Sequence, residues 1–267
     1  MNQIAIITPV PDVIDTLITN SILRKAVERN AVKFRIVNLR QFGLGNYRQI
    51  DDAPFGGGSG MVMMAEPLIR AIEHAMGLID GSEDAQVIYP SPQGETWNQK
   101  SASQTSKLKK LIVICGHYKG IDERVIDRFG IQEYSLGDFV LTSGEIPAMV
   151  MVDSMVRLIP GTLNTLDSAL TDTFTHDLLD HPHYTQPRDI EGLRVPNVLL
   201  SGHHKEIKTW KQKQREKRTK GRRPDLWKIY KKKLKELVKG ANDNMRALEK
   251  QLRDLQGCLL YTSDAAD

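Results

Sequence analysis

The sequence has few cysteines and no long hydrophobic run. Its 267 residues include two cysteines, Cys115 and Cys258, which lie far apart. This excludes a disulfide scaffold and a multi-cysteine metal site. No apolar run approaches the roughly 20 residues that a membrane-spanning helix needs. With 40% hydrophobic and 26% charged residues, the composition is that of a folded globular protein. The length suits one large domain or two smaller ones.

The amino terminus lacks the features of a secretory signal. The segment MNQIAIITPV has no basic residue, and Thr8, Pro9 and Pro11 interrupt its apolar stretch. Signal peptides need a basic region followed by an uninterrupted apolar one. We therefore expect a cytoplasmic protein without a membrane segment.

Positive charge is concentrated in one part of the chain. Residues 203–239 hold 16 Lys and Arg against four Asp and Glu, a net charge of +12, whereas the whole chain has +4 and the remainder therefore −8. A solvated helix face is the ordinary explanation of such a run. Here the imbalance is too large for ion pairs along a helix to neutralise, and Trp210 and Trp227 flank its most basic part, KQKQREKRTKGRRP (211–224). A polyanion would relieve the repulsion, so the segment predicts an RNA or DNA partner.

The first two-thirds of the chain alternate strand-like and helix-like segments. Apolar or alternating runs predict strands at 3–8, 32–39, 85–89 and 110–115. Amphipathic spacing predicts helices at 12–29, with Asp12 as the N-cap, and at 67–76. A third helix is expected at 145–158, with Met149, Met151 and Met155 filling the core. Strands separated by helices predict an α/β fold with a parallel sheet.

A basic helical region is expected after a domain boundary. Thr, Asp, His and Pro replace the regular pattern in 164–187, which predicts a linker between a domain at 1–163 and a second at 188–256. The second domain is expected to hold helices at 205–218, 225–239 and 242–256, with breaks at Gly221 and Pro224. Residues 257–267 do not continue the pattern, and we predict a non-native or disordered tail there.

Several glycine-containing segments could form a ligand site. PFGGGSGM (54–61) is either a phosphate-binding loop or a flexible surface loop, and it matches neither the P-loop nor the dinucleotide motif. SPQGE (91–95), CGHYKGIDERV (115–125) and SLGDFVLTSGE (135–145) each follow a predicted extended segment. Parallel α/β sheets bind ligands at the carboxyl ends of their strands. The three segments therefore predict a binding site at that edge.

Other polar residues allow more than one interpretation. One cluster of histidines and aspartates could be a metal site or a hydrogen-bonded loop. It comprises His176, Asp177, Asp180, His181 and His183. Its spacing matches no zinc signature, so we expect no metal there. Taken alone, Asp172 and Arg157 are ordinary surface charges.

Six segments taken together resemble one known family. They are IDDAPFGGGSGMVMM, YPSPQG, CGHYKGIDERV, SLGDFVLTSGEIPAM, LLDHPHYTQP and VPNVLLSGHHKEI. In order and spacing they are similar to bacterial tRNA (guanine-N1)-methyltransferases, the TrmD-type enzymes of the SPOUT class. The resemblance runs from about residue 4 to residue 226, and several independent motifs in register make it highly specific.

The resemblance implies a fold, a cofactor and an assembly. The fold is a parallel-sheet SPOUT domain with a deep trefoil knot, an exception to the rule against threaded chains, followed by a smaller helical C-terminal domain. The enzymes are homodimers whose partner subunit completes each active site, and S-adenosylmethionine binds bent in the knot. Matching motifs imply that the cofactor contacts Tyr89, Ser91, Pro92, Gly116, Tyr118, Leu136, Gly137, Asp138, Phe139, Val140 and Leu141.

The activity implied is methylation of guanine N1 at tRNA nucleotide 37, on the 3′ side of the anticodon. Guanine N1 carries a proton, so a general base must remove it, and the charge that develops on O6 needs a cation. Matching motifs assign these roles to Asp172 in LTDTF and Arg157 in SMVRLIPG. The base must also flip out of the RNA stack. The residues expected to bind tRNA are Lys205, Lys208, Lys211, Lys213, Arg215, Arg218, Arg222 and Arg223.

The chain departs from the family pattern at a few positions. The usual GRYEGIDERV is here GHYKGIDERV, with His117 and Lys119, and Ser143 replaces a glycine. The acid usual at position 119 has been linked to magnesium, so a lysine there leaves the magnesium requirement open. These changes favour an alternative, a knotted tRNA-binding paralogue with weak or no methyl transfer, whereas Asp172 and Arg157 favour the enzyme. A dehydrogenase is excluded because no strand–GxGxxG–helix unit occurs.

Overall fold

The computed structural model describes residues 1–79, 84–163, 173–174 and 177–263. The chain divides into two compact units, residues 1–170 and 171–267, and the division falls inside the linker predicted at 164–187. Each unit is considered separately below. Asp172, the predicted general base, lies outside the described residues.

The first unit contains a five-stranded parallel sheet. Its strands are β1 (Asn2–Thr8), β2 (Val32–Asn38), β5 (Gln86–Thr96), β6 (Lys110–Ile114) and β7 (Gln132–Ser135), in the order β2-β1-β6-β5-β7. Every neighbouring pair is parallel, with Ile6 of β1 opposite both Ile36 of β2 and Val113 of β6. A short antiparallel pair, β3 (Asp51–Asp52) and β4 (Val62–Met63), lies outside this sheet. The predicted α/β class and the parallel sheet are confirmed.

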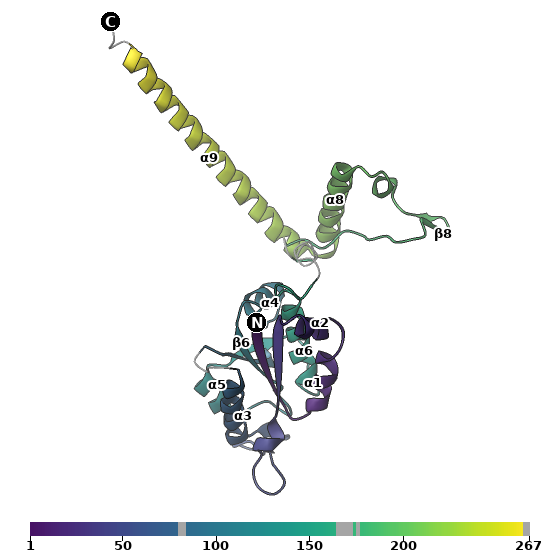
Figure 1. Cartoon of the computed structure of the whole chain (residues 1–267), viewed down its shortest axis with the longest axis vertical. Coiled ribbons are helices and arrows are strands. Elements are labelled where there is room, and N and C mark those ends of the chain that lie inside the picture. Colours follow the sequence, from purple (N-terminus) through teal and green to yellow (C-terminus); the bar gives the residue numbers. More distant parts are fainter. Residues whose placement is uncertain (80–83, 164–172, 175–176, 264–267) are drawn as a thin grey trace. The chain divides into compact units, whose positions relative to one another are not determined.

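Helices cover both faces of the sheet. Figure 1 shows α3 (Ala65–Leu78) and α5 (Glu123–Phe129) on one side of the sheet, and α1 (Pro11–Ile18), α2 (Ser21–Glu28) and α6 (Glu145–Val156) on the other. A further helix, α4 (Gln99–Thr105), contacts α6, and the 3-10 helix η1 (Leu39–Phe42) contacts α3.

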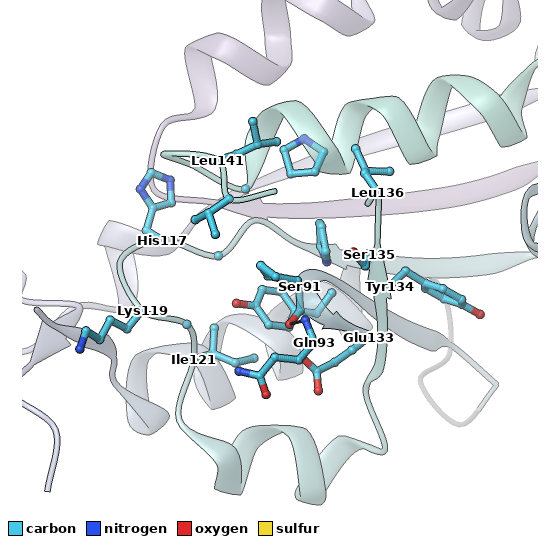
Figure 2. A pocket seen from close by; sticks show the side chains of 18 of the residues that line it. Ser91, Gln93, His117, Lys119, Ile121, Glu133, Tyr134, Ser135, Leu136 and Leu141 are labelled. Carbon is cyan, nitrogen blue, oxygen red and sulfur yellow. Dashed lines mark hydrogen bonds between the residues drawn. The ribbon is translucent and has the colours of Figure 1, made fainter. Parts of the chain in front are cut away.

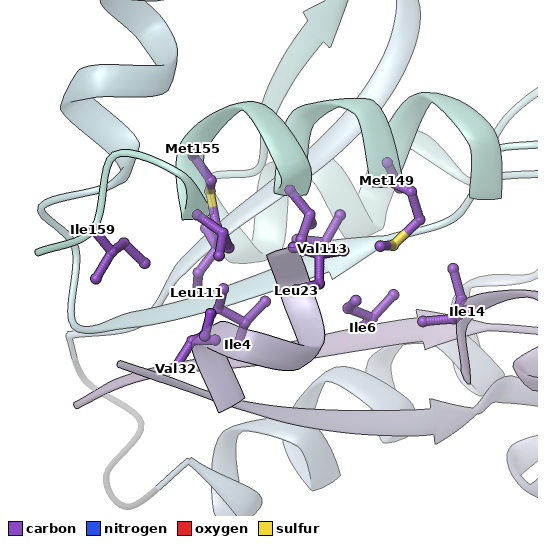
Figure 3. Close-up of a cluster of buried hydrophobic side chains, with 14 of the residues drawn as sticks. Ile4, Ile6, Ile14, Leu23, Val32, Leu111, Val113, Met149, Met155 and Ile159 are labelled. Carbon is purple, nitrogen blue, oxygen red and sulfur yellow. The ribbon is translucent and has the colours of Figure 1, made fainter. Parts of the chain in front are cut away.

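Alternation along the strands builds two hydrophobic cores. Ile4 and Ile6 point into the cluster that includes Met149 and Met155 of α6 (Figure 3), whereas Ala5 and Ile7 join the cluster on the opposite face. Successive strand residues face opposite sides of a sheet, so a continuous apolar run such as β1 supplies both cores. Met149, Met151 and Met155 are all buried, which confirms them as core residues.

Two predicted elements differ in the structure. The helix expected at 12–29 is two helices, α1 and α2, and the backbone of Ser21 at the start of α2 has a positive φ of 53°. The prediction that Asp12 is the N-cap is wrong, because Val10 is the N-cap and Pro11 begins α1. Proline suits the first helical position, where no N–H is needed.

The strand predicted at 85–89 is longer in the structure, because it includes the segment SPQGE, which was expected to follow it. Strand β5 continues through it to Thr96. A register shift between Pro90 and Glu95 accommodates the intervening residues, and Glu95 then pairs with Tyr134 of β7.

The second unit is mainly helical. After the antiparallel pair β8 (Asp189–Ile190) and β9 (Leu193–Arg194) and the 3-10 helix η2 (Asn197–Leu200) come α8 (His204–Arg222) and α9 (Pro224–Ser263). The break expected at Gly221 is wrong, because α8 continues through it, whereas the break before Pro224 is confirmed. The helices expected at 225–239 and 242–256 are one helix, α9, which extends into residues predicted as a tail. No helix in the described part of the chain is both long and apolar enough to span a bilayer.

Candidate functional site

A cavity of about 360 Å³ opens in the first unit at the carboxyl ends of β5, β6 and β7. Most of its lining comes from three segments: 89–93 of β5, 116–121 after β6, and 133–137 with 139–144, from β7 and the loop to α6 (Figure 2). Glu123 and Ile126 of α5 and Pro147 of α6 complete it. The volume lies within the range of small-molecule sites, about 300–1,000 Å³. The cavity therefore lies at the edge of the sheet where the sequence predicts a ligand site.

Two glycines let these segments approach one another. A β-carbon added to Gly116 would lie 2.4 Å from Cε2 of Tyr89, and one added to Gly144 would lie 2.4 Å from the backbone nitrogen of Gly116. Real β-carbons do not approach other atoms so closely, and overpacking of this kind forces the backbone to shift. Glycine is therefore required at both positions for the cavity walls to pack as they do.

A tyrosine with a raised pKa forms part of the cavity floor. Burial, with a smaller contribution from the negative charge of Glu133, raises the pKa of Tyr89 to about 12. Its ring is 6% exposed and lies against Gly116. Tyr89 is thus a neutral hydrogen-bonding group throughout the physiological pH range.

A hydrogen-bonded turn shapes the segment after β7. The hydroxyl of Ser135 donates to the carbonyl oxygen of Gly137 and accepts from its N–H, both at 3.1 Å. The N–H of Phe139 donates to the same carbonyl at 2.9 Å. Gly137 has a φ of 147°, which side chains other than glycine rarely adopt. Beyond this turn Phe139, Val140 and Leu141 are exposed at the cavity although they are apolar.

The structure brings together most of the residues expected to contact the cofactor. Ten of the eleven line the cavity, while Asp138 is exposed and is not among the lining residues. The ten are Tyr89, Ser91, Pro92, Gly116, Tyr118, Leu136, Gly137, Phe139, Val140 and Leu141.

Sequence reasoning missed several lining residues. Gln93, His117 and Glu133 all line the cavity (Figure 2). Glu133 is the second residue of β7, and Gln93 lies two residues beyond Ser91 on β5. The alternation of side chains along a strand, started from Ser91, could have found Gln93.

Lys119 lies at the outer edge of the cavity. Its backbone N–H donates to the carbonyl of Met61 at 3.0 Å. Its side chain passes the segment PFGGGSGM (54–61, the glycine loop), and a β-carbon added to Gly60 would lie 3.0 Å from it. Figure 2 shows the ammonium directed away from the cavity. Residues 55–60 are exposed and are not among the lining residues, which favours the surface-loop interpretation of PFGGGSGM.

The two predicted catalytic residues cannot be compared geometrically, because Asp172 lies outside the described residues. Arg157 directly follows α6 and is half-buried, and its N–H donates to the carbonyl of Asp153 at 3.3 Å.

The histidine and aspartate cluster of the second unit is hydrogen-bonded. Asp180 accepts from Nε2 of His183 at 2.8 Å and from the backbone N–H of His181 at 2.7 Å. Burial raises the pKa of Asp180, but these hydrogen bonds leave it below its ordinary value. Asp177 pairs with Lys233 at 2.5 Å, whereas His176 lies outside the described residues. The contacts match the hydrogen-bonded loop expected, although ligand atoms of Asp180, His181 and His183 lie within 4.8 Å of one another.

The predicted tRNA-binding residues differ in their surroundings. Arg218 donates to the carbonyl of Asp180 at 3.5 Å, and Arg223 pairs with Asp225 at 2.6 Å. Arg215 is half-buried, with Nε and Nη2 lacking a hydrogen-bond partner in the described part of the chain. The remaining five are exposed on α8: Lys205, Lys208, Lys211, Lys213 and Arg222.

Comparison with known proteins shows which family the chain is similar to. A family model described as "tRNA (Guanine-1)-methyltransferase TrmD" matches residues 2–229. The tRNA (guanine-N(1)-)-methyltransferase of Clostridioides difficile strain 630 is 45% identical over 223 residues, which is 84% of this chain and 96% of that protein. The enzyme of the same name from Bacillus subtilis strain 168 is 44% identical over 228 residues, covering 85% and 93%. This chain belongs to the TrmD family of tRNA (guanine-1)-methyltransferases.

Proposed function

We propose that the protein transfers a methyl group from S-adenosylmethionine to N1 of guanine at tRNA nucleotide 37, in the cytoplasm. One observation carries the proposal: a cavity of suitable size lies at the strand ends where ten residues implied by the family's motifs converge. The family membership supplies the reaction type, and the cavity supplies a place for the methyl donor.

The cavity walls suit S-adenosylmethionine. Leu136, Val140 and Leu141 offer apolar surface for a flat adenine, while the carboxylate of Glu133 and the hydroxyl of Ser91 offer hydrogen bonds to polar groups. When bound, S-adenosylmethionine supplies an electrophilic methyl group.

The protein must remove the proton from N1 of guanine. Neutral guanine has no free lone pair at N1, so it becomes a nucleophile only as the proton leaves and negative charge develops on O6. We assign proton acceptance to the carboxylate of Asp172 and stabilisation of O6 to the guanidinium of Arg157. A general base typically contributes about 10²–10⁴-fold to the rate.

A trefoil knot and a homodimer belong to this proposal. The family resemblance implies the knot, and the close packing of Gly144 on Gly116 supports it to the extent that the chain leading into α6 contacts the loop after β6. Exposed apolar residues support the dimer: Ile146 and Val150 share one face of α6, and Val13 and Leu17 share one face of α1. The contact between α1 and α6 brings these two helices together. Exposed apolar patches of this kind mark protein interfaces.

The exposed basic residues of α8 are proposed to bind tRNA phosphates. Lys205, Lys208 and Lys211 are exposed, and the 203–239 segment carries a net charge of +12. Lysine side chains bind phosphate as point charges and release the counterions condensed on the nucleic acid.

The test is transfer of a labelled methyl group from S-adenosylmethionine to an unmodified tRNA that carries guanosine at position 37. We expect transfer to this tRNA and none when position 37 is adenosine. Tight tRNA binding without transfer would instead identify a tRNA-binding paralogue.

A further inference from the structure

A buried carboxylate lies beside the cavity. Glu145, the first residue of α6, is 2% exposed. The hydroxyl of Thr8 donates to its Oε1 at 2.6 Å, and Nε2 of His117 lies 2.9 Å from each of its oxygens. A buried carboxylate remains charged only where hydrogen bonds and an opposite charge offset its loss of water.

The contacts of Glu145 keep it ionised. Burial raises its pKa, but the hydrogen bonds from His117 and Thr8 leave it below its ordinary value. Within the described residues, His117 is the basic side chain that lies within ion-pair distance of Glu145. A protonated His117 therefore makes a neutral pair, whereas a neutral imidazole leaves one buried negative charge.

The pair connects two segments that line the cavity. Thr8 ends β1, His117 belongs to the loop after β6, and Glu145 follows the loop after β7 directly. Gly116 and His117 of the first loop line the cavity, as do Ser143 and Gly144 of the second. The hydrogen bonds between His117 and Glu145 therefore help to fix the distance between the two loops.

The two titratable residues nearest to His117 on the amino-terminal and carboxy-terminal sides have raised pKa values. Burial, with a smaller contribution from Glu145, raises the pKa of Cys115 well above its ordinary value. Burial, followed by the nearby carboxylate of Asp51, raises the pKa of Tyr118. Both side chains are therefore neutral near neutral pH and bring no charge to the His117–Glu145 pair.

We propose that His117 is a positioning residue that, through Glu145, holds the two loops in the arrangement that binds S-adenosylmethionine. Loss of the contact between His117 and Glu145 should therefore weaken the affinity for S-adenosylmethionine. This inference rests on the function proposed above and adds to it a residue that acts on the cofactor site through another side chain.

The experiment measures the dissociation constant of S-adenosylmethionine by calorimetry for the unmodified protein and for two variants. His117→Arg keeps a cationic hydrogen-bond donor beside Glu145, so its affinity should stay close to that of the unmodified protein. His117→Ala removes this partner of Glu145, so its affinity should fall on the order of tenfold. We expect a raised KM for S-adenosylmethionine and an unchanged kcat in His117→Ala.

His74→Gln is the matched control. His74 lies on α3, exposed and outside the cavity lining, with its ring 5.4 Å from that of Phe42. This variant should keep the S-adenosylmethionine affinity of the unmodified protein. If His117→Ala does not fold, His117→Gln keeps a hydrogen-bond donor without a positive charge and should bind S-adenosylmethionine more weakly than His117→Arg.

The two proposals fail in different ways. If the unmodified protein does not bind S-adenosylmethionine at any pH, the proposed function is wrong. If it binds and His117→Ala binds with the same affinity, or if His117→Gln binds as tightly as His117→Arg, the role of His117 is wrong while the function stands.

Discussion

Gly144 packs directly on Gly116, with the site of a missing β-carbon 2.4 Å from the backbone nitrogen and 2.6 Å from the carbonyl oxygen of Gly116. The contact joins the entry of α6 to the loop after β6, and both glycines line the cavity. Because the atoms that a β-carbon would meet here all belong to the backbone, no side-chain rotation could make room for a larger residue at Gly144.

Gly144→Ala should therefore separate the two loops, lower stability by about 1–3 kcal/mol and abolish S-adenosylmethionine binding. Gly77→Ala is the matched control, since Gly77 lies in α3 and a β-carbon there meets no atom within 4 Å. That change should raise stability by about 0.5–1 kcal/mol. Denaturant unfolding and calorimetric titration measure both effects, and normal cofactor affinity in Gly144→Ala would refute the packing argument.

Replacement of Asp172 by asparagine tests the general base. Turnover should fall by about 10²–10⁴-fold, because the amide cannot accept the N1 proton. Affinities for S-adenosylmethionine and tRNA should stay close to those of the unmodified protein. Single-turnover kinetics measure the chemical step, and a rate within a few-fold of normal would remove Asp172 from the mechanism.

The exposed lysines of α8 should control the salt dependence of tRNA binding. Changing Lys205, Lys208 and Lys211 to glutamine should weaken tRNA binding. The slope of log K against log salt should become less steep by about 0.7–0.9 for each phosphate that the protein no longer neutralises. Lys25→Gln on α2 removes an exposed charge from the other unit and should leave the slope unchanged. A steep slope that survives the triple change would place the tRNA-binding surface elsewhere.

We predict activity without magnesium, because the resemblance implies a magnesium-linked acid at position 119 and this chain has Lys119 there. Two charges about 4 Å apart interact by roughly 1 kcal/mol in water and 4 kcal/mol at a dielectric of 20, and the exposed position of Lys119 favours the smaller figure. Activity should therefore persist in EDTA. The activity of Lys119→Glu should fall about fivefold in EDTA and recover when magnesium is added. Loss of activity on chelation in the unmodified enzyme contradicts this account.

Tyr89 should make the fold sensitive to alkaline pH. Its pKa is about 12 in the folded protein and near 10 when exposed, so the unfolded chain releases the proton first as pH rises. Stability is thus full below about pH 10 and falls by up to roughly 2.7 kcal/mol between pH 10 and 12. Tyr89→Phe should lose less stability than the unmodified protein over this interval in denaturant unfolding. Equal losses would show that Tyr89 is not the responsible group.

The sheet and the place of the cavity follow from local sequence. The apolar run of β6 and the alternating run of β2 determine strands wherever they lie, and glycine-containing segments after parallel strands indicate the ligand-binding edge. What local sequence does not indicate is which of those segments remain extended. Pro90, Pro92 and Gly94 suggest a turn, yet pairing with β7 keeps β5 extended to Thr96.

The break between α1 and α2 arises from local polar groups. The apolar spacing continues across the break. However, the hydroxyl of Thr19 donates to the carbonyl of Asp15, and the side-chain amide of Asn20 donates to the carbonyl of Thr16. These side chains satisfy carbonyl groups at the helix end and so favour termination there.

The His117–Glu145 pair could not be predicted from spacing. Its members lie 28 residues apart, on two loops that meet only because Gly116 and Gly144 allow their backbones to touch. In the same way, the exposed ammonium of Lys119 follows from its backbone hydrogen bond with Met61, which no sequence pattern indicates.

The most direct measurement is the position of the methyl group in tRNA after reaction with S-adenosylmethionine, read by nuclease digestion and mass spectrometry. The account predicts 1-methylguanosine at nucleotide 37 as the product, formed by the unmodified enzyme and nearly absent with Asp172→Asn. A methyl group at another nucleotide or another guanine atom, or no product despite tight binding of both substrates, would contradict it.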